Sequence, residues 1–322
     1  MIVTHDFGDA MVFRSTVAED VDRVVAVRVA EPVRWIQAER YRAELAARRY
    51  RPEWTWIAEA NQRIVARALW WGRADSLVPI ALDCLYIEES IEDKAGLAAQ
   101  LLTTAHRWFG EQGARTLPMF NITLTNDWHD DPAARNAMAW RRAAAGAAGL
   151  THEVERLQFE WTPQIPVPES TGRLVFRPEP SDATILALFR RIAEGSLDDE
   201  TGKNLAVVGA DETARLDLEF YLDAPGKRDW WRTAHTPDGV LVGLAIPSAT
   251  AYHPNVGYLG VLPEARGHGY GPEILAEITR MHAANGAEKI TATTDLANFP
   301  MAAGFRRAGY RNTETRVVFS AA

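Results

Sequence analysis

The sequence contains two copies of one pattern, and this repetition limits the folds that the chain can adopt. Four segments of the first half recur in the same order in the second half: Val12–Arg14 as Val175–Arg177, a hairpin pattern at 56–69 as one at 233–246, Gly96–Ala114 as Gly269–Ala287, and Ala148–Phe159 as Ala308–Phe319. A repeat of this length indicates tandem domains and not a solenoid of short units.

We expect domains at residues 1–161 and 173–322, joined by a linker at 162–172. The linker has no hydrophobic periodicity, and Pro163, Pro166 and Pro168 favour a short, semi-rigid connector. Each copy is predicted to form a strand, helices, three strands, a helix, a strand, a helix and a last strand. That order is typical of an α/β domain with a mixed sheet.

A glycine-rich turn in the second copy predicts an anion-binding site. The turn follows an apolar run at Val256–Leu262, which is typical of a strand, and Pro272 marks the start of a helix that we expect to end at Gly286. Three glycines occupy alternate positions of the turn, Gly267, Gly269 and Gly271. Glycines let the backbone approach a ligand closely, and the N-terminus of a helix favours negative charge. With the positive charge of Arg266, the turn predicts a phosphate or pyrophosphate ligand.

The residues after this helix extend the pattern. A predicted strand at Glu288–Thr294 is followed by Asp295 and Asn298, by a helix at Met301–Ala308 and by the turn Gly309–Tyr310. Together with the glycine turn, this block resembles the cofactor-binding half of the GNAT superfamily of acyl-CoA N-acyltransferases. The tandem layout is similar to that of mycothiol synthase and of antibiotic-modifying acetyltransferases, so the resemblance implies two tandem GNAT-like domains.

The resemblance implies that the second copy binds acetyl-CoA. Leu259 would pair with the pantetheine arm, and the backbone N–H of Val261 would polarise the acyl carbonyl group. The other residues of the implied cofactor site are Arg266, Gly267, His268, Gly269, Tyr270, Gly271, Asn298 and Phe305. The family often has a tyrosine as general acid where this chain has Phe305, and a phenyl ring cannot donate that proton.

The family's reaction is a direct attack of a neutral amine on the thioester within a ternary complex. Besides Val261, we expect Tyr258 and Asp295 to act in catalysis. Tyr258 is predicted to face the acceptor, and Asp295 follows a strand whose end is expected to open on the cleft. Asp295 is interpreted as a base or as a group that orients the acceptor, and the alternative is a cap on the turn into the next helix.

Acidic residues early in the second copy suggest a cationic acceptor. Asp198, Asp199 and Glu200 are candidates to bind the amine of an amino-sugar, an aminoglycoside, a polyamine or a secondary metabolite, and the alternative is a solvated loop with a helix cap. The formal net charge of −8 is compatible with an amine partner and argues against nucleic acid, whose phosphates need a basic face.

The first copy differs from the second where the phosphate would bind. Asp93 stands in the position of Arg266, and Ala98 replaces Gly271. A carboxylate at that position repels an anion. We therefore expect the first copy to bind no acyl-CoA and to help shape the acceptor cleft of the second.

Other features exclude several classes of protein. The histidines have no paired spacing of the zinc type, and Cys84 is the single cysteine, so we expect neither a metal site nor a disulfide. No apolar run has membrane-spanning length, and residues 1–12 lack the pattern of a signal peptide. We expect a cytoplasmic monomer or homodimer. The alternatives to an enzyme of this kind are a non-catalytic sensor of acyl-CoA or of a metabolite and, on weaker grounds, an aminoacyl-transfer enzyme that uses tRNA.

Overall fold

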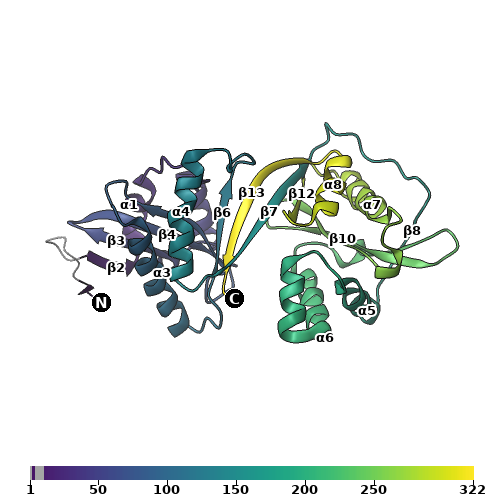
Figure 1. Cartoon of the computed structure of the whole chain (residues 1–322), viewed down its shortest axis with the longest axis horizontal. Coiled ribbons are helices and arrows are strands. Elements are labelled where there is room, and N and C mark those ends of the chain that lie inside the picture. Colours follow the sequence, from purple (N-terminus) through teal and green to yellow (C-terminus); the bar gives the residue numbers. More distant parts are fainter. Residues whose placement is uncertain (1, 4–10) are drawn as a thin grey trace. The chain divides into compact units, whose positions relative to one another are not determined.

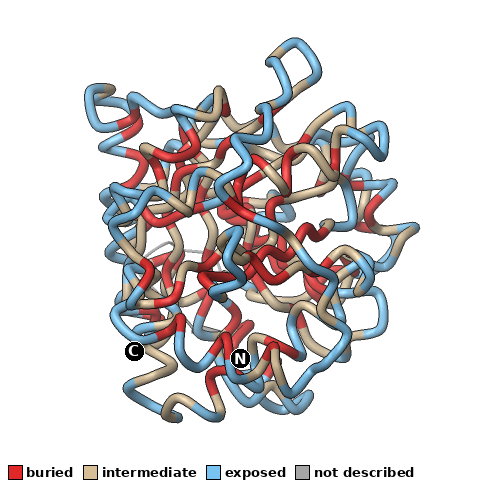
Figure 2. The backbone as a smooth tube through the Cα atoms, turned by 90° about the vertical axis from the view of Figure 1, so that its right-hand side faces the viewer, coloured by how far each residue is buried: buried red, intermediate tan, exposed pale blue. Residues whose placement is uncertain are grey.

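The computed structural model describes residues 2–3 and 11–322, shown as coloured ribbons in Figure 1. Residues 1–12, for which the sequence predicts no signal peptide, lie mostly outside the described residues. The chain forms two compact units, of which unit 1 comprises Met1–Val154 and Thr315–Ala322, and unit 2 comprises Glu155–Glu314. Buried positions lie mainly in the interior of the backbone trace, and the outer loops are mostly exposed (Figure 2).

Unit 1 has a mixed sheet with helices on both faces. Its strands are ordered β1-β2-β3-β4-β5-β6, followed by the end of β13. The elements are β1 (Ile2–Val3), β2 (Met11–Ser15), α1 (Val21–Ala26), α2 (Ala38–Ala46), β3 (Thr55–Ala60), β4 (Arg63–Trp71), β5 (Ala81–Ile87), α3 (Lys94–Glu111), β6 (Met119–Leu124) and α4 (Pro132–Ala147). The apolar sides of α3 and α4 form the larger core against one face of the sheet. A smaller core beneath α1 and α2 covers the other face and contains Val24, Tyr41 and Leu69.

Unit 2 repeats this arrangement, with the strand order β7-β12-β11-β10-β9-β8. Its elements are β7 (His152–Trp161), β8 (Val175–Pro178), α5 (Asp182–Ala193), α6 (Asp199–Asp223), β9 (Arg232–His235), β10 (Leu241–Ala249), β11 (Pro254–Val261), α7 (Tyr270–Ala284), β12 (Ile290–Asp295), α8 (Phe299–Arg307) and β13 (Arg311–Ser320). A Cβ atom built on Gly243 would lie 2.8 Å from Ile274 of α7, and one on Gly260 would lie 2.5 Å from Ile192 of α5. Thus α7 and α5 cover opposite faces of the sheet. The predicted mixed α/β architecture is confirmed.

The last strand of each copy completes the sheet of the other unit. Residues Thr315–Phe319 of β13 pair antiparallel with β6, whereas residues Arg156–Trp161 of β7 pair antiparallel with β12. This division differs from the boundaries expected from the sequence, which kept each last strand with its own copy. Both strands alternate buried and less buried residues in the same way, so the pattern does not specify which sheet edge each one joins. Residues 162–172 contain no helix or strand.

Candidate active site

Strands β11 and β12 separate at their carboxyl ends and leave an open edge. These parallel neighbours share one register pair among the described residues, Asn255 with Thr291, although both strands continue beyond it. The N–H of Leu262 donates to Val242 of β10. Because N–H groups alternate in direction along a strand, the N–H groups of Leu259 and Val261 face the open edge. This is the location that the sequence analysis predicted for the pantetheine arm and the acyl carbonyl group.

The glycine turn after β11 presents the uncapped N-terminus of α7. Gly267 and Gly269 have φ values of 82° and 76°, a conformation that favours glycine, and Gly269 is the N-cap residue. Within the described residues, α7 has no side-chain cap hydrogen bond at this N-cap. Its backbone N–H groups are therefore available to an anion.

The matching helix of unit 1 has its N-terminus occupied. Asp93 is the N-cap residue of α3, and its carboxylate accepts a hydrogen bond of 2.8 Å from the N–H of Gly96. A Cβ atom built on Gly96 would lie 2.1 Å from that carboxylate. A negative charge thus takes the place of the anion, which supports the expectation that the first copy binds no acyl-CoA.

The side chain of Arg266 is engaged within the protein. Its Nη1 donates to the carbonyl oxygens of Glu194 at 2.7 Å and Gly195 at 3.3 Å, and its Nη2 donates to Ile192 at 2.7 Å. Its Nε donates to Val261 at 3.2 Å. Arg266 therefore binds the carbonyl groups at the end of α5 and ties that helix to the glycine turn. The predicted role as a positive group facing the phosphates is not supported by this geometry.

A different arginine, which the sequence analysis missed, lies beside the glycine turn. The Nη2 of Arg173 donates to the carbonyl oxygen of His268 at 2.6 Å, and its guanidinium lies 5.4 Å from the ring centroid of Tyr270. The rings of His268 and Tyr270 stack at 5.8 Å. A Cβ atom built on Gly269 would lie 3.5 Å from Nη1 of Arg173. Arg173 follows the proline-rich linker, and no motif in the sequence connects it to the turn.

On the opposite face of β11, aromatic rings surround Tyr258. Its ring centroid lies 4.9 Å from that of Phe189 and 5.9 Å from that of Tyr221, so it points toward α5 and α6. Burial and the nearby Asp217 raise the pKa of the Tyr258 phenol well above its ordinary value. At neutral pH this hydroxyl remains protonated and is a hydrogen-bond donor, not a base.

Asp217 of α6 is a further candidate that sequence reasoning did not single out for catalysis. Burial, followed by the charges of Asp198 and Glu200, raises the pKa of its carboxyl group to about 6. A carboxyl group that titrates near neutral pH is suited to general base catalysis. The sequence feature that could have identified Asp217 is its position on the apolar side of α6, between the buried residues Ala214 and Leu218.

Asp295 is buried and holds the beginning of α6 in place. One carboxylate oxygen accepts from Nε of Arg156 at 2.7 Å, and the other accepts from the backbone N–H of Asp199 at 2.7 Å. Since both oxygens are occupied, the geometry favours a positioning role over that of a base. The carboxylate caps a helix, as the alternative interpretation held, but the helix is α6 and not the one that follows in sequence.

The three acidic residues predicted to bind the acceptor differ in environment. Asp198 is the N-cap residue of α6 and accepts hydrogen bonds of 2.9 Å from the backbone N–H and the hydroxyl of Thr201. Asp199 contributes its backbone N–H to Asp295, and Glu200 is exposed. The cap predicted as the alternative is therefore present, while Asp198 and Glu200 also contribute to the negative potential at Asp217.

Two predicted cofactor residues after β12 have structural partners. Phe305 is 2% exposed, and its ring stacks on Phe159 of β7 with centroids 5.0 Å apart. The side chain of Asn298 caps α8 by accepting from Met301 N–H at 3.3 Å. These contacts do not direct either side chain at the open edge of β11. The assignment of Phe305 and Asn298 to the cofactor site therefore stays a prediction.

No group of three or more His, Cys, Asp or Glu residues in residues 2–3 and 11–322 is arranged to hold a metal ion. Within the same residues, no helix is long and apolar enough to cross a membrane.

Comparison with known proteins gives a family match for a segment of the second half and solved structures with a similar fold. Residues 201–310 match the sequence profile described as the Acetyltransferase (GNAT) family. A GCN5-related N-acetyltransferase from Sphaerobacter thermophilus is 17% identical, with a TM-score of 0.55 over 96% of this chain and 95% of that one. The glucosamine N-acetyltransferase region of a fungal multi-domain GH3 β-N-acetylglucosaminidase is 18% identical, with a TM-score of 0.54 over 98% of this chain and 39% of that one.

A tandem GNAT protein from the clavulanic acid biosynthesis pathway is 16% identical, with a TM-score of 0.47 over 97% of this chain and 98% of that one. A comparison with the sequences of curated proteins gives no match.

Proposed function

Because this chain carries a GNAT-family acetyltransferase domain in its second half, we propose that it transfers an acetyl group from acetyl-CoA to a primary amine of a small polar acceptor. The observation that carries the proposal is the divergence of β11 from β12 directly before the uncapped N-terminus of α7. An extended thioester arm fits along the free edge of β11, and a pyrophosphate fits at the first turn of α7. Arg173 adds a positive charge beside that turn.

The reaction requires few groups from the protein. The neutral amine nitrogen attacks the thioester carbonyl carbon, the C–N bond forms, and the carbonyl oxygen becomes an oxyanion. The N–H of Val261 faces the open edge and is the donor that would stabilise this charge. The C–S bond then breaks. The thiolate is reprotonated by solvent, which is feasible because an ordinary thiol has a pKa of about 8.5.

Asp217 is our candidate for the base, because it lies near Tyr258 and its pKa is raised. Its carboxylate would attract the ammonium form of the acceptor and take the proton that the nitrogen loses as the C–N bond forms. The pKa of about 6 keeps this group ionised at neutral pH. The neighbouring Asp198 and Glu200 increase the negative potential and favour a cationic acceptor such as an amino-sugar, an aminoglycoside, a polyamine or an amine-bearing secondary metabolite.

One observation favours a second candidate function. Phe305 is packed in the core at the position where the family often has its tyrosine acid. A protein that binds acyl-CoA or a metabolite without turnover needs no such acid, so a sensor is the alternative.

Calorimetric titration of acetyl-CoA, followed by a thiol-release assay with amines, distinguishes these functions. We expect one acetyl-CoA per chain, about 10-fold weaker binding in Arg173→Ala, and no change in the control Arg177→Ala, whose exposed side chain lies on β8. Thiol release with any of the polyamines, aminoglycosides, amino acids or amino-sugars supports the enzyme. Binding without release from any of them supports the sensor, and a failure of wild type to bind acetyl-CoA refutes both the enzyme and a sensor of acetyl-CoA.

A further inference from the structure

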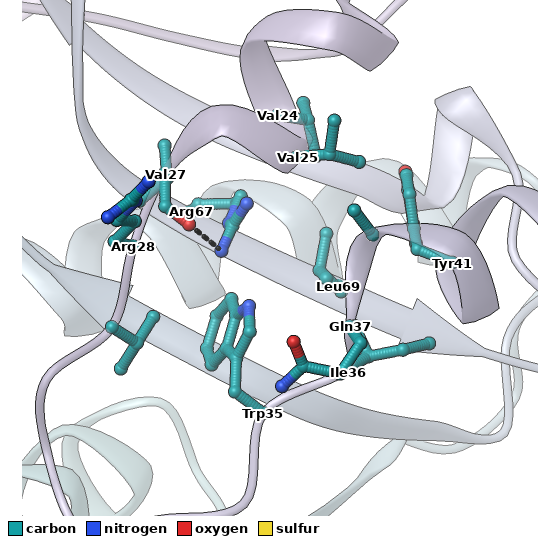
Figure 3. Close-up of a pocket in the computed structure, with 12 residues that line it drawn as sticks. Val24, Val25, Val27, Arg28, Trp35, Ile36, Gln37, Tyr41, Arg67 and Leu69 are labelled. Atoms are coloured by element: carbon teal, nitrogen blue, oxygen red, sulfur yellow. Dashed lines mark hydrogen bonds between the residues drawn. The ribbon is translucent and has the colours of Figure 1, made fainter.

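Unit 1 contains a pocket that the proposed function does not use. It has a volume of about 400 Å³ and lies between α1, the segment that connects α1 to α2, and the face of β4 (Figure 3). Helix α1 has six residues, whereas α5, the matching helix of unit 2, has twelve. The short helix is followed by an irregular segment at 27–37, and this leaves room over the sheet. A pocket of this size is suited to a small organic molecule.

A buried arginine forms the polar part of this pocket. Arg67 of β4 is 2% exposed, and its guanidinium lies 4.4 Å from the ring centroid of Trp35. Its Nε has no hydrogen-bond partner within the described residues, and its Nη2 has a long contact of 3.5 Å with the carbonyl oxygen of Val27. Figure 3 shows the guanidinium between Val27 and Trp35, directed into the pocket. The edge formed by Nε and Nη2 is the one that binds a carboxylate with two parallel hydrogen bonds.

The charge of Arg67 is not compensated by the groups around it. The charged or polar neighbours that affect its pKa are Cys84, Tyr41 and Tyr86, and none of them is a carboxylate. Burial raises the pKa of Cys84 to about 12 and raises that of Tyr41, so both are neutral at pH 7. A buried charge without a counter-charge is costly, and an anionic ligand removes that cost.

Most of the other lining side chains are aliphatic, and Gln37 is a further polar one. The aliphatic side chains belong to α1, the connecting segment and β4: Val24, Val25, Val27, Val29, Ile36 and Leu69. The exposed Arg28 also lines the pocket and adds positive charge. One buried guanidinium balances a single negative charge, and the aliphatic side chains favour a hydrocarbon body over a hydrated phosphate.

We propose that this pocket of unit 1 binds a small organic acid, with its carboxylate on the Nε–Nη2 edge of Arg67 and its apolar body against the valine, isoleucine and leucine side chains. The site is separate from the acetyl-CoA site proposed for unit 2. It also gives the first copy a binding role, although its counterpart of the pyrophosphate turn is blocked by Asp93.

The test is ligand-observed NMR, together with thermal unfolding, on the full chain. The probes are 3-methylbutyrate and phenylacetate, with phenylacetamide as the uncharged analogue and inorganic phosphate as the competing anion. We expect saturable binding of at least one carboxylate, and at least about 10-fold weaker binding of phenylacetamide and phosphate.

The variant Arg67→Met should weaken carboxylate binding by about 10- to 100-fold, and Arg67→Lys should weaken it by less. The matched control is Arg63→Met on the same strand, which removes an exposed arginine paired with Glu88 and should bind as wild type does. Val29→Trp, which fills the pocket and leaves Arg67 unchanged, should also abolish binding and tests the site even if Arg67→Met does not fold.

Three results would overturn the proposal. The first is that neither carboxylate binds wild type at about 10 mM, a concentration that corresponds to very weak affinity. The second is that phenylacetate and phenylacetamide bind equally well. The third is that binding is unchanged in both Arg67→Met and Val29→Trp. None of these outcomes affects the titration of acetyl-CoA, so the two proposals fail independently.

Discussion

The substitution Asp217→Asn tests the environment of the proposed base before any acceptor is known. The pKa of this carboxyl group is raised from 3.8 to about 6, and each pKa unit corresponds to about 1.4 kcal/mol of unfolding free energy. The full shift is therefore about 3 kcal/mol, which we reduce to about 1–2 kcal/mol because the side chain is partly open to solvent. Ionised Asp217 thus destabilises the folded protein by this amount.

The sign of the pH dependence follows from the raised pKa. Between the unfolded value of 3.8 and the folded value of about 6, the folded state binds more protons than the unfolded state, so the stability of the wild type decreases as pH rises through this range. Asparagine has no charge at any pH. We expect Asp217→Asn to be about 1–2 kcal/mol more stable than wild type at pH 8 and to have no such advantage at pH 3.

Urea unfolding at both pH values measures this difference. The control is Asp211→Asn, which removes an exposed carboxylate of the same helix, paired with Arg190, and should change the stability by less than about 1 kcal/mol. If Asp217→Asn is equally or less stable than wild type at pH 8, Asp217 is not desolvated as described. Once an acceptor is found, kcat of the same variant should be about 10²- to 10⁴-fold lower than that of wild type. The decrease in rate that the wild type shows below about pH 6 should be absent from the pH profile of the variant.

Three further substitutions test other parts of the structure. Asp295→Asn should destabilise unit 2 by about 2 kcal/mol in urea unfolding, because half-buried Arg156 loses the nearer of its two carboxylate partners, and a loss below about 1 kcal/mol would contradict the positioning role. Gly269→Ala should cost about 1–2 kcal/mol at its φ of 76° and weaken acetyl-CoA binding in calorimetry, whereas unchanged binding would argue against the α7 site. Asp93→Ala should cost about 1 kcal/mol as a lost helix cap and leave the acetyl-CoA affinity unchanged, so a second binding site in this variant would contradict our account of unit 1.

Much of the candidate cofactor site was predictable because it depends on short-range structure. The strand before the glycine turn, the turn itself and the following helix were placed from the residue pattern, and the helix is followed by Gly286 in the left-handed conformation, as expected. Backbone conformations at Gly267 and Gly269 and the free N–H groups of a helix N-terminus are properties of a few consecutive residues. The same holds for Asp93, whose capping of α3 involves residues three positions apart.

The phosphate contact inferred for Arg266 stays a prediction, and the partners that its side chain has in the structure are mostly distant in sequence. A positive residue before a glycine turn predicts a phosphate contact when only the neighbouring residues are considered. In the structure, the carbonyl groups at the end of α5 lie within its reach, and they bind its guanidinium. Arg173 is brought to the turn by the path of the chain after the linker, which no spacing rule describes.

Repetition, hydrophobic period and glycine conformation are local properties, so the residue pattern alone indicates that the chain is duplicated, that each copy is an α/β domain and that the second copy contains a glycine turn suited to an anion. The packing of distant segments, in contrast, places the last strand of each copy in the other sheet, brings Asp295 to α6, and puts Asp217 and Arg67 in partly or fully buried surroundings. The ionisation and the partners of such groups depend on how much water and which charges surround them. Those surroundings arise only when strands and helices distant in sequence pack together.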